Sequence, residues 1–171
     1  LDIYGRRRVG KTYLIQSVYQ NHIIFECSGL HEDGLKAQLQ NFWHALIRHS
    51  RSSFLTSPPA SWLQAFELLG RILEGNKQKS KKVIFLDELP WFDTPRSGFM
   101  AALANFWNNW GSKRLDLILV LCGSAASWMI KNLIQNRGGL HNRVTRKVRL
   151  LPFNLKETKA FLVQKKIMLT E

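Results

Sequence analysis

One octapeptide near the start of the chain has residue types and spacing suited to chemistry: Gly5-Arg6-Arg7-Arg8-Val9-Gly10-Lys11-Thr12. It fits G-x-x-x-x-G-K-[ST], the pattern of a phosphate-binding P-loop. The glycines let the backbone turn tightly and approach an anion with no Cβ in the way. Backbone N–H groups then form an anion-binding concavity, and the following helix adds its partly positive N-terminus. All eight residues are therefore predicted to bind a nucleotide. Lys11 would reach the β/γ-phosphates and the Thr12 hydroxyl would bind Mg²⁺. The alternative is a chance match in a glycine turn.

A pair of adjacent acids is the second candidate. Asp87 and Glu88 follow the apolar run Val83-Ile84-Phe85-Leu86, which is typical of a strand buried on both faces. An acidic residue at the end of such a strand is the pattern of a Walker B motif. Asp87 is predicted to hold Mg²⁺, directly or through water, beside Thr12. Glu88 is predicted to polarise the attacking water as general base. The alternative is an ordinary acidic loop.

Two further residues are candidates for catalysis. Ser124 follows the apolar run 115–122, whose end we expect beside Asp87 and near the γ-phosphate. It is predicted to sense phosphate or orient water, and the alternative is an N-cap for a helix at 125–132. Arg143 lies in a glycine-rich loop and is predicted to act as an arginine finger, in its own chain or in a neighbouring subunit. Arg146 and Arg137 are rivals for that role, and a solvated basic loop is the alternative.

The elements that must position these residues alternate along the chain. Strand patterns cover 1–4, 22–27, 83–86, 115–122 and 144–151, and helical spacing or caps mark the segments between them. Alternating strands and helices imply right-handed crossovers and a five-stranded parallel sheet covered on both faces. The predicted fold class is therefore α/β, with a three-layer α-β-α core. Residues 1–171 form one domain, which we expect to belong to a longer protein because the chain starts at Leu1 and ends within a helical pattern.

The composition indicates which kinds of partner and which location suit the protein. The net charge of +13 and pI of about 10.2 suit nucleic acid, an acidic partner or phosphates, unless other parts of the protein rebalance the charge. Cys27 and Cys122 each lie in an apolar run, so buried, reduced thiols and a cytoplasmic location are predicted. No apolar run approaches the ~20 residues of a membrane span, so no membrane partner is expected. The side chains of Arg6, Arg7 and Arg8 are expected to point outward, or to join a nucleic-acid patch.

Guanine specificity is disfavoured. The segment Asn76-Lys77-Gln78-Lys79 lacks the aspartate of an Asn-Lys-x-Asp motif and precedes the wrong strand. The adjacent Asp87 and Glu88, with a strand between the P-loop and Walker B strands, indicate the ATP-hydrolysing branch instead.

Four segments stand together in a fixed order. They are Gly-Arg-Arg-Arg-Val-Gly-Lys-Thr at 5–12, Phe-Leu-Asp-Glu-Leu-Pro-Trp-Phe-Asp at 85–93, Leu-Cys-Gly-Ser-Ala at 121–125, and His-Asn-Arg-Val-Thr at 141–145 before Leu-Leu-Pro-Phe. This combination resembles the archaeal-type ATPase family, found also in bacteria and placed among the AAA+-like and STAND P-loop ATPases. The resemblance implies the sheet order 5-1-4-3-2, ATP with Mg²⁺, and a helical or winged-helix region downstream. It places functional positions at Lys11, Thr12, Asp87 and Glu88, with Ser124 as the sensor candidate.

The sequence leaves three functions open. The first is an ATPase domain that binds and hydrolyses Mg-ATP and uses the ATP and ADP states as a switch on a downstream domain. The second is a nucleic-acid-associated module in which nucleotide binding is secondary. The third is a nucleotide-binding regulator with negligible hydrolysis. The oligomeric state is also open.

Overall fold

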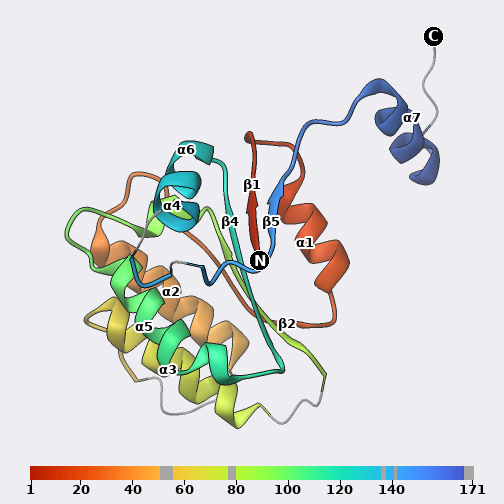
Figure 1. Ribbon diagram of the computed structural model, residues 1–171. Helices are drawn as coiled ribbons and strands as arrows, with labels where there is room; N and C mark the ends of the chain where they lie inside the picture. The colour runs from red at the N-terminus through yellow and green to blue at the C-terminus, as the bar shows by residue number, and fades with distance from the viewer. Residues whose placement is uncertain (51–55, 77–79, 136–137, 141, 168–171) are drawn as a thin grey trace.

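The fold is seen in a computed structural model that describes residues 1–50, 56–76, 80–135, 138–140 and 142–167 (Figure 1). Strands and helices alternate as the sequence predicts. The strands are β1 (Asp2–Tyr4), β2 (Ile23–Ser28), β3 (Lys82–Asp87), β4 (Leu117–Gly123) and β5 (Lys147–Arg149). The helices are α1 (Lys11–Tyr19), α2 (Leu35–His49), α3 (Trp62–Gly75), α4 (Leu89–Phe92), α5 (Phe99–Asn109), α6 (Ala126–Met129) and α7 (Leu155–Gln164). A 3-10 turn, Gly111–Lys113, follows α5, and a π-helical turn, Ile130–Ile134, follows α6.

The five strands form one parallel sheet in the order β2-β3-β4-β1-β5. This confirms the predicted order 5-1-4-3-2. The central strands are apolar on both faces and buried, as expected for parallel sheets covered by helices. Strand β5 is shorter than the predicted 144–151 because its only partner in the described part of the sheet, β1, is itself three residues long.

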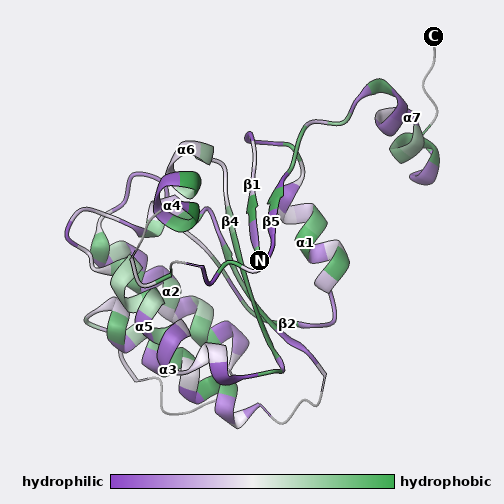
Figure 2. Cartoon of the chain, in the orientation of Figure 1, coloured by the Kyte–Doolittle hydropathy of each residue, from purple (hydrophilic) through white to green (hydrophobic). Residues whose placement is uncertain are grey.

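Helices cover the sheet in two layers. Helix α1 packs on one face through Ile15, over a small cluster that includes Val83 and Phe85. Helices α2, α3 and α5 cover the other face, over a larger cluster rich in aromatic rings. Figure 2 shows the apolar colouring running along the central strand β4 between these layers. Both free cysteines, Cys27 and Cys122, are buried, as predicted. Within the described residues no helix is long and apolar enough to cross a membrane.

Local signals explain where some helices begin. Ser61 accepts a hydrogen bond from the backbone N–H of Gln64 and so caps α3. The Gln64 side chain accepts from the backbone N–H of Ala60 rather than from that of Ser61, so only one half of a capping box forms here. Asn154 and Glu157 form the full reciprocal box at the start of α7. Helix α4 was missed because a four-residue helix is too short to show periodicity.

Asp2 is a buried charge inside the sheet. Its side chain is fully buried, and among the described residues neither carboxylate oxygen has a hydrogen-bond partner. Burial raises the pKa of Asp2 to about 6, although the positive charge of Lys147 acts to lower it. An acid with a raised folded-state pKa binds protons more readily in the folded protein, so its charged form opposes folding above pH 6.

We therefore expect Asp2→Asn to be more stable than the wild type at pH 7.5. The gain has an upper bound of about 3 kcal/mol, because the pKa moves by roughly two units and each unit is worth about 1.4 kcal/mol. The gain should shrink as the pH falls from 6 towards 4. Urea unfolding of both proteins at pH 7.5 and 4.5 measures it, with the exposed Asp33→Asn as control. A stability difference that is the same at both pH values would contradict the assignment.

Candidate nucleotide-binding site

The predicted P-loop connects the carboxyl end of β1 to the first turn of α1. Its two glycines are required for different reasons. A Cβ on Gly5 would collide with the backbone carbonyl of Leu150, which follows β5. Gly10 has a φ of 88°, a left-handed conformation that side chains disfavour. The first glycine thus allows close packing with the edge strand, and the second allows the turn into the helix.

Lys11 is the first residue of α1 and is buried. Its ammonium donates hydrogen bonds to the carbonyl oxygens of Gly5, at 3.0 Å, and Arg6, at 2.8 Å. The charge is therefore held against the loop, beside the helix N-terminus. Both features favour an anion at this position.

Thr12 and Asp87 meet, as the sequence predicts for a pair of metal ligands. The Thr12 hydroxyl donates to Asp87 Oδ2 at 2.6 Å, and Asp87 Oδ1 accepts from the backbone N–H of Glu88 at 2.9 Å. A hydroxyl and a carboxylate suit Mg²⁺, which takes oxygen ligands and usually completes its shell with water and substrate phosphates. The described residues contain no cluster of three or more His, Cys, Asp or Glu side chains that could form a protein-only metal cage.

Glu88 and Ser124 also meet. The Glu88 carboxylate accepts from the Ser124 hydroxyl at 2.8 Å and from the Ser124 backbone N–H at 3.2 Å. Glu88 itself has a left-handed backbone, with φ 46° and ψ 49°. Ser124 does not cap the next helix with its side chain, because α6 has Ala125 at its N-cap and no side-chain capping bond there. The Ser124 hydroxyl is directed to the predicted general base instead.

The turn that carries Glu88 is fixed from both sides by glycines. A Cβ on Gly29, after β2, would lie 2.8 Å from the Glu88 carbonyl oxygen and 2.9 Å from the Trp91 Cβ. A Cβ on Gly123, at the end of β4, would lie 2.9 Å from Pro90. Only glycine at both positions lets the neighbouring strand ends approach this closely. The sequence analysis missed this role, although a glycine at the end of each strand flanking β3 was a visible signal.

The thiol of Cys122 lies beside the site without being reactive. Burial is the main cause that raises its pKa far above the usual range, and the nearby Asp87 charge and hydrogen bond add to the effect. Cys122 is therefore a neutral, buried neighbour of Asp87. It is no candidate nucleophile, because the thiolate is the reactive form.

Arg143 is not brought to the P-loop. It lines a cavity of about 310 Å³ with Leu1 and Leu117, at the amino ends of β1 and β4. The P-loop and Ser124 follow the carboxyl ends of the same strands, so Arg143 lies at the opposite edge of the sheet. The rival Arg146 is at that edge too, since its carbonyl accepts from the N–H of Asp2. Arg137 lies outside the described residues. In this conformation none of the described candidates acts as an arginine finger within its own chain.

A hollow of about 590 Å³ opens directly beside the P-loop. It lies between α1 and α7, and its walls include Gly10, Tyr13, Pro152, Phe153 and Phe161. The Tyr13 and Phe161 rings meet edge to face, with their centroids 6.2 Å apart. The sequence analysis missed this hollow because its two walls are about 140 residues apart in the chain.

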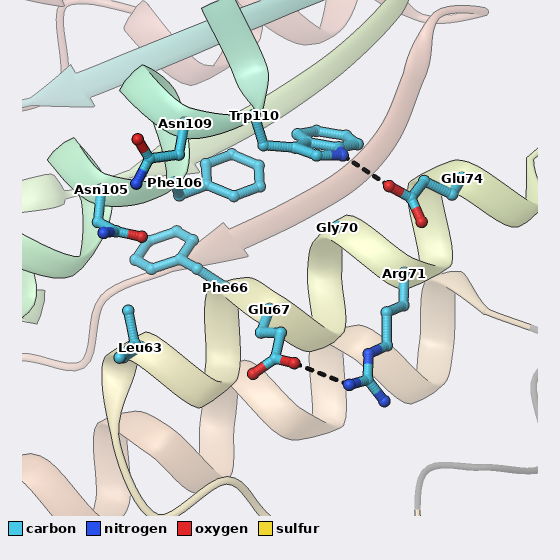
Figure 3. A pocket seen from close by; sticks show the side chains of 10 residues that line it. All are labelled: Leu63, Phe66, Glu67, Gly70, Arg71, Glu74, Asn105, Phe106, Asn109 and Trp110. Atoms are coloured by element: carbon cyan, nitrogen blue, oxygen red, sulfur yellow. Dashed lines mark hydrogen bonds and ion pairs between the residues drawn. The ribbon is translucent and has the colours of Figure 1, made fainter.

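A second hollow, of about 410 Å³, lies between α3 and α5 (Figure 3). Phe66 and Phe106 line it, and Trp110 closes one end by donating to the Glu74 carboxylate at 2.8 Å. None of its lining residues belongs to the loops that follow β1, β3 or β4. It is therefore separate from the candidate nucleotide-binding site.

Comparison with known proteins supports the fold. A scan against protein-family models and a search of curated proteins found no match. Among solved structures, the chain is similar to the Walker-type ATPase PABY2304 of Pyrococcus abyssi, with TM-score 0.70 and 18% identity over 99% of this chain and 54% of that one. It is also similar to the Orc1 protein of Aeropyrum pernix, solved in complex with DNA, with TM-score 0.60 and 14% identity over 96% of this chain and 42% of that one. The chain thus has a P-loop ATPase fold and spans about half the length of these structures.

The packing of the Glu88 turn gives a test of the site. Gly29→Ala should displace the turn, because the new Cβ would lie 2.8 Å from the Glu88 carbonyl oxygen and 2.9 Å from the Trp91 Cβ. We expect a loss of about 1–3 kcal/mol in the free energy of unfolding. We also expect nucleotide turnover to fall about 10- to 100-fold, since small misplacements of catalytic groups are costly. ADP affinity should be unchanged. Gly34→Ala is the matched control, because its Cβ would meet nothing within 4 Å. Equal turnover in both variants would contradict this role of Gly29.

Proposed function

We propose that residues 1–171 are an ATPase domain that binds and hydrolyses Mg-ATP. The observation that carries the proposal is the hydrogen bond between Thr12 and Asp87 at 2.6 Å, because it joins the P-loop to the strand end that bears Glu88. Lys11, the pair of Thr12 with Asp87, and Glu88 therefore all lie at the carboxyl edge of the sheet. Ligands of open α/β sheets bind at this carboxyl edge.

Each residue has a role in the proposed reaction. Lys11 neutralises charge on the β/γ-phosphates. Thr12 and Asp87 would hold Mg²⁺, which would supply further positive charge at the phosphates. Glu88 accepts a proton from water as the water oxygen bonds to the γ-phosphorus. The bond from that phosphorus to the bridging oxygen breaks, giving ADP and phosphate. Ser124 holds the Glu88 carboxylate in place for this step. An arginine finger, if one is used, comes from Arg143 of a neighbouring copy.

The hollow between α1 and α7 is the proposed site of the adenine base. It adjoins Gly10 of the P-loop, and the aromatic rings of Tyr13 and Phe161 suit a flat heterocycle. Because α7 forms one wall, ATP and ADP states would be communicated to whatever follows α7. This suits the proposed conformational switch acting on the helical or winged-helix region that the resemblance to the archaeal-type ATPase family implies downstream.

The proposal is tested by two substitutions. Lys11→Ala should weaken ATP binding about 10- to 100-fold, because a charge-assisted hydrogen bond to phosphate contributes about 1.5–3 kcal/mol. Glu88→Gln should retain ATP binding but lose at least about 100-fold in hydrolysis, the usual contribution of a general base. Equilibrium titration and single-turnover hydrolysis measure the two effects. Glu67→Gln, on the exposed side of α3, is the control.

The outcomes separate the functions left open by the sequence. If Lys11→Ala binds ATP as tightly as the wild type, the phosphate site is wrong. If Glu88→Gln hydrolyses normally, its role as base is wrong. Tight binding with negligible single-turnover hydrolysis by the wild type would identify a nucleotide-binding regulator instead.

Nucleic-acid binding is the second candidate, and the net charge of +13 favours it. The similarity to Orc1 agrees with this candidate, since that structure contains DNA. Binding through lysine and arginine contacts to phosphates must weaken steeply as salt rises, because counterions are released. Titrations of duplex and single-stranded DNA at 50 to 200 mM salt should therefore show a linear fall of log affinity with log salt. Absence of binding at the lowest salt would rule this candidate out.

A further inference from the structure

The side chain of Arg7 is directed toward the catalytic turn. Its guanidinium carbon lies 5.5 Å from the centroid of the Trp91 ring. Arg7 belongs to the loop after β1, whereas Trp91 belongs to the turn after β3. Because β4 lies between these strands, the contact crosses the carboxyl end of β4, where Ser124 holds Glu88. Arg7 is exposed, as expected from the sequence, and its guanidinium lies over the Trp91 ring.

The Trp91 ring, which faces the Arg7 guanidinium, is held in place by its neighbours. Its backbone N–H donates to the Glu88 carbonyl at 3.0 Å, which ties the ring to the residue proposed as general base. The His31 ring meets it edge to face, with centroids 4.9 Å apart. Gly29 leaves space for its Cβ. Residues after β2 and β3 thus fix the ring, and Arg7 reaches it from the loop after β1.

The contact between Arg7 and the Trp91 ring is weak enough for a phosphate group to replace the ring as the partner of Arg7. An exposed arginine above an indole ring is stabilised less than an arginine that makes charge-assisted hydrogen bonds to phosphate oxygens. A phosphate group bound between the P-loop and Glu88 would therefore draw the guanidinium from the ring. Arg7 also carries a fixed positive charge in the loop itself, whereas Arg143 lies at the opposite edge of the sheet.

We propose that Arg7 is a catalytic residue that contacts the γ-phosphate of ATP, and that Trp91 is its positioning residue. Arg7 would stabilise charge on the transferred phosphoryl group, the task otherwise given to an arginine finger. Trp91 would hold the guanidinium beside the Glu88 turn until ATP is bound. This inference rests on the proposed ATPase function.

The test compares Arg7→Ala and Arg7→Lys with a matched control. Arg7→Ala should lose about tenfold in ATP affinity with little change in ADP affinity, because only ATP has the γ-phosphate. Its single-turnover hydrolysis should fall about 100-fold or more, the scale of a missing catalytic arginine. Arg7→Lys should recover ATP affinity in part. The control is Arg114→Ala, which removes another arginine above a tryptophan, at 4.8 Å from the Trp110 ring and away from the P-loop. It should leave both affinities and the hydrolysis rate unchanged.

Trp91 is tested by its fluorescence and by substitution. The difference between wild-type and Trp91→Phe emission should change when ATP, but not ADP, is added, because Arg7 leaves the ring. In an Arg7→Ala background this change should be absent. Trp91→Leu should lower the hydrolysis rate by about three- to tenfold at nearly constant ATP affinity, and Trp91→Phe should lower it less, since phenylalanine keeps a π face.

The outcomes distinguish this inference from the function on which it rests. If the wild type binds no ATP, the proposed function and the inference fall together. If the wild type binds and hydrolyses ATP but Arg7→Ala loses nothing, or loses ATP and ADP affinity equally, the inference alone is wrong. Circular dichroism melts of Arg7→Ala and Arg114→Ala check that both remain folded. Arg7 is exposed, whereas Arg114 is ion-paired with Asp116 at 3.1 Å, so any loss of stability is expected in the control.

Discussion

The Asp87 carboxylate joins the two halves of the candidate site. One oxygen accepts from the Thr12 hydroxyl, and the other accepts from the Glu88 backbone N–H. Asp87 is nearly buried, and a buried carboxylate without partners would oppose folding. The same bonds therefore satisfy the acid and fix the spacing between the start of α1 and the turn after β3. Since β1 and β3 are not neighbours, the sheet ladder alone does not fix this spacing.

Packed aromatic rings also fix the Glu88 turn against helices α3 and α5. Phe92 closes the Glu88 turn, is fully buried, and stacks on Phe99 of α5 with centroids 5.3 Å apart. It also meets Trp62 of α3 edge to face at 5.5 Å. The turn is therefore anchored in packed rings below and confined by strand-end glycines at its sides. Close-packed interiors tolerate little displacement, so the position of the proposed base is a property of the whole layer on that face.

The predictable parts were those set by local sequence. The P-loop pattern, the buried run before Asp87 and the alternation of strands and helices each lie within a few adjacent residues, and a single parallel sheet brings their ends to one edge. The family resemblance supplied the strand order. The contacts between Arg7 and Trp91 and between Tyr13 and Phe161 depend on how distant segments pack, which no local pattern encodes. The position of Arg143 was not predictable for the same reason: the loop before β5 lies at the amino ends of its neighbours, away from the P-loop of its own chain.

Helix α7 shows how binding could become a signal. It has no buried residue, and Leu155 and Val163 are largely exposed. Its contacts with α1 include the edge-to-face pair of Phe161 with Tyr13 and the Lys165 ammonium 5.3 Å from the Tyr13 ring centroid. A base bound between α1 and α7, as proposed, would add contacts to both helices. A ligand shifts an equilibrium only through such differential contacts. An element this lightly attached is therefore the part of the fold whose position a nucleotide would bias most.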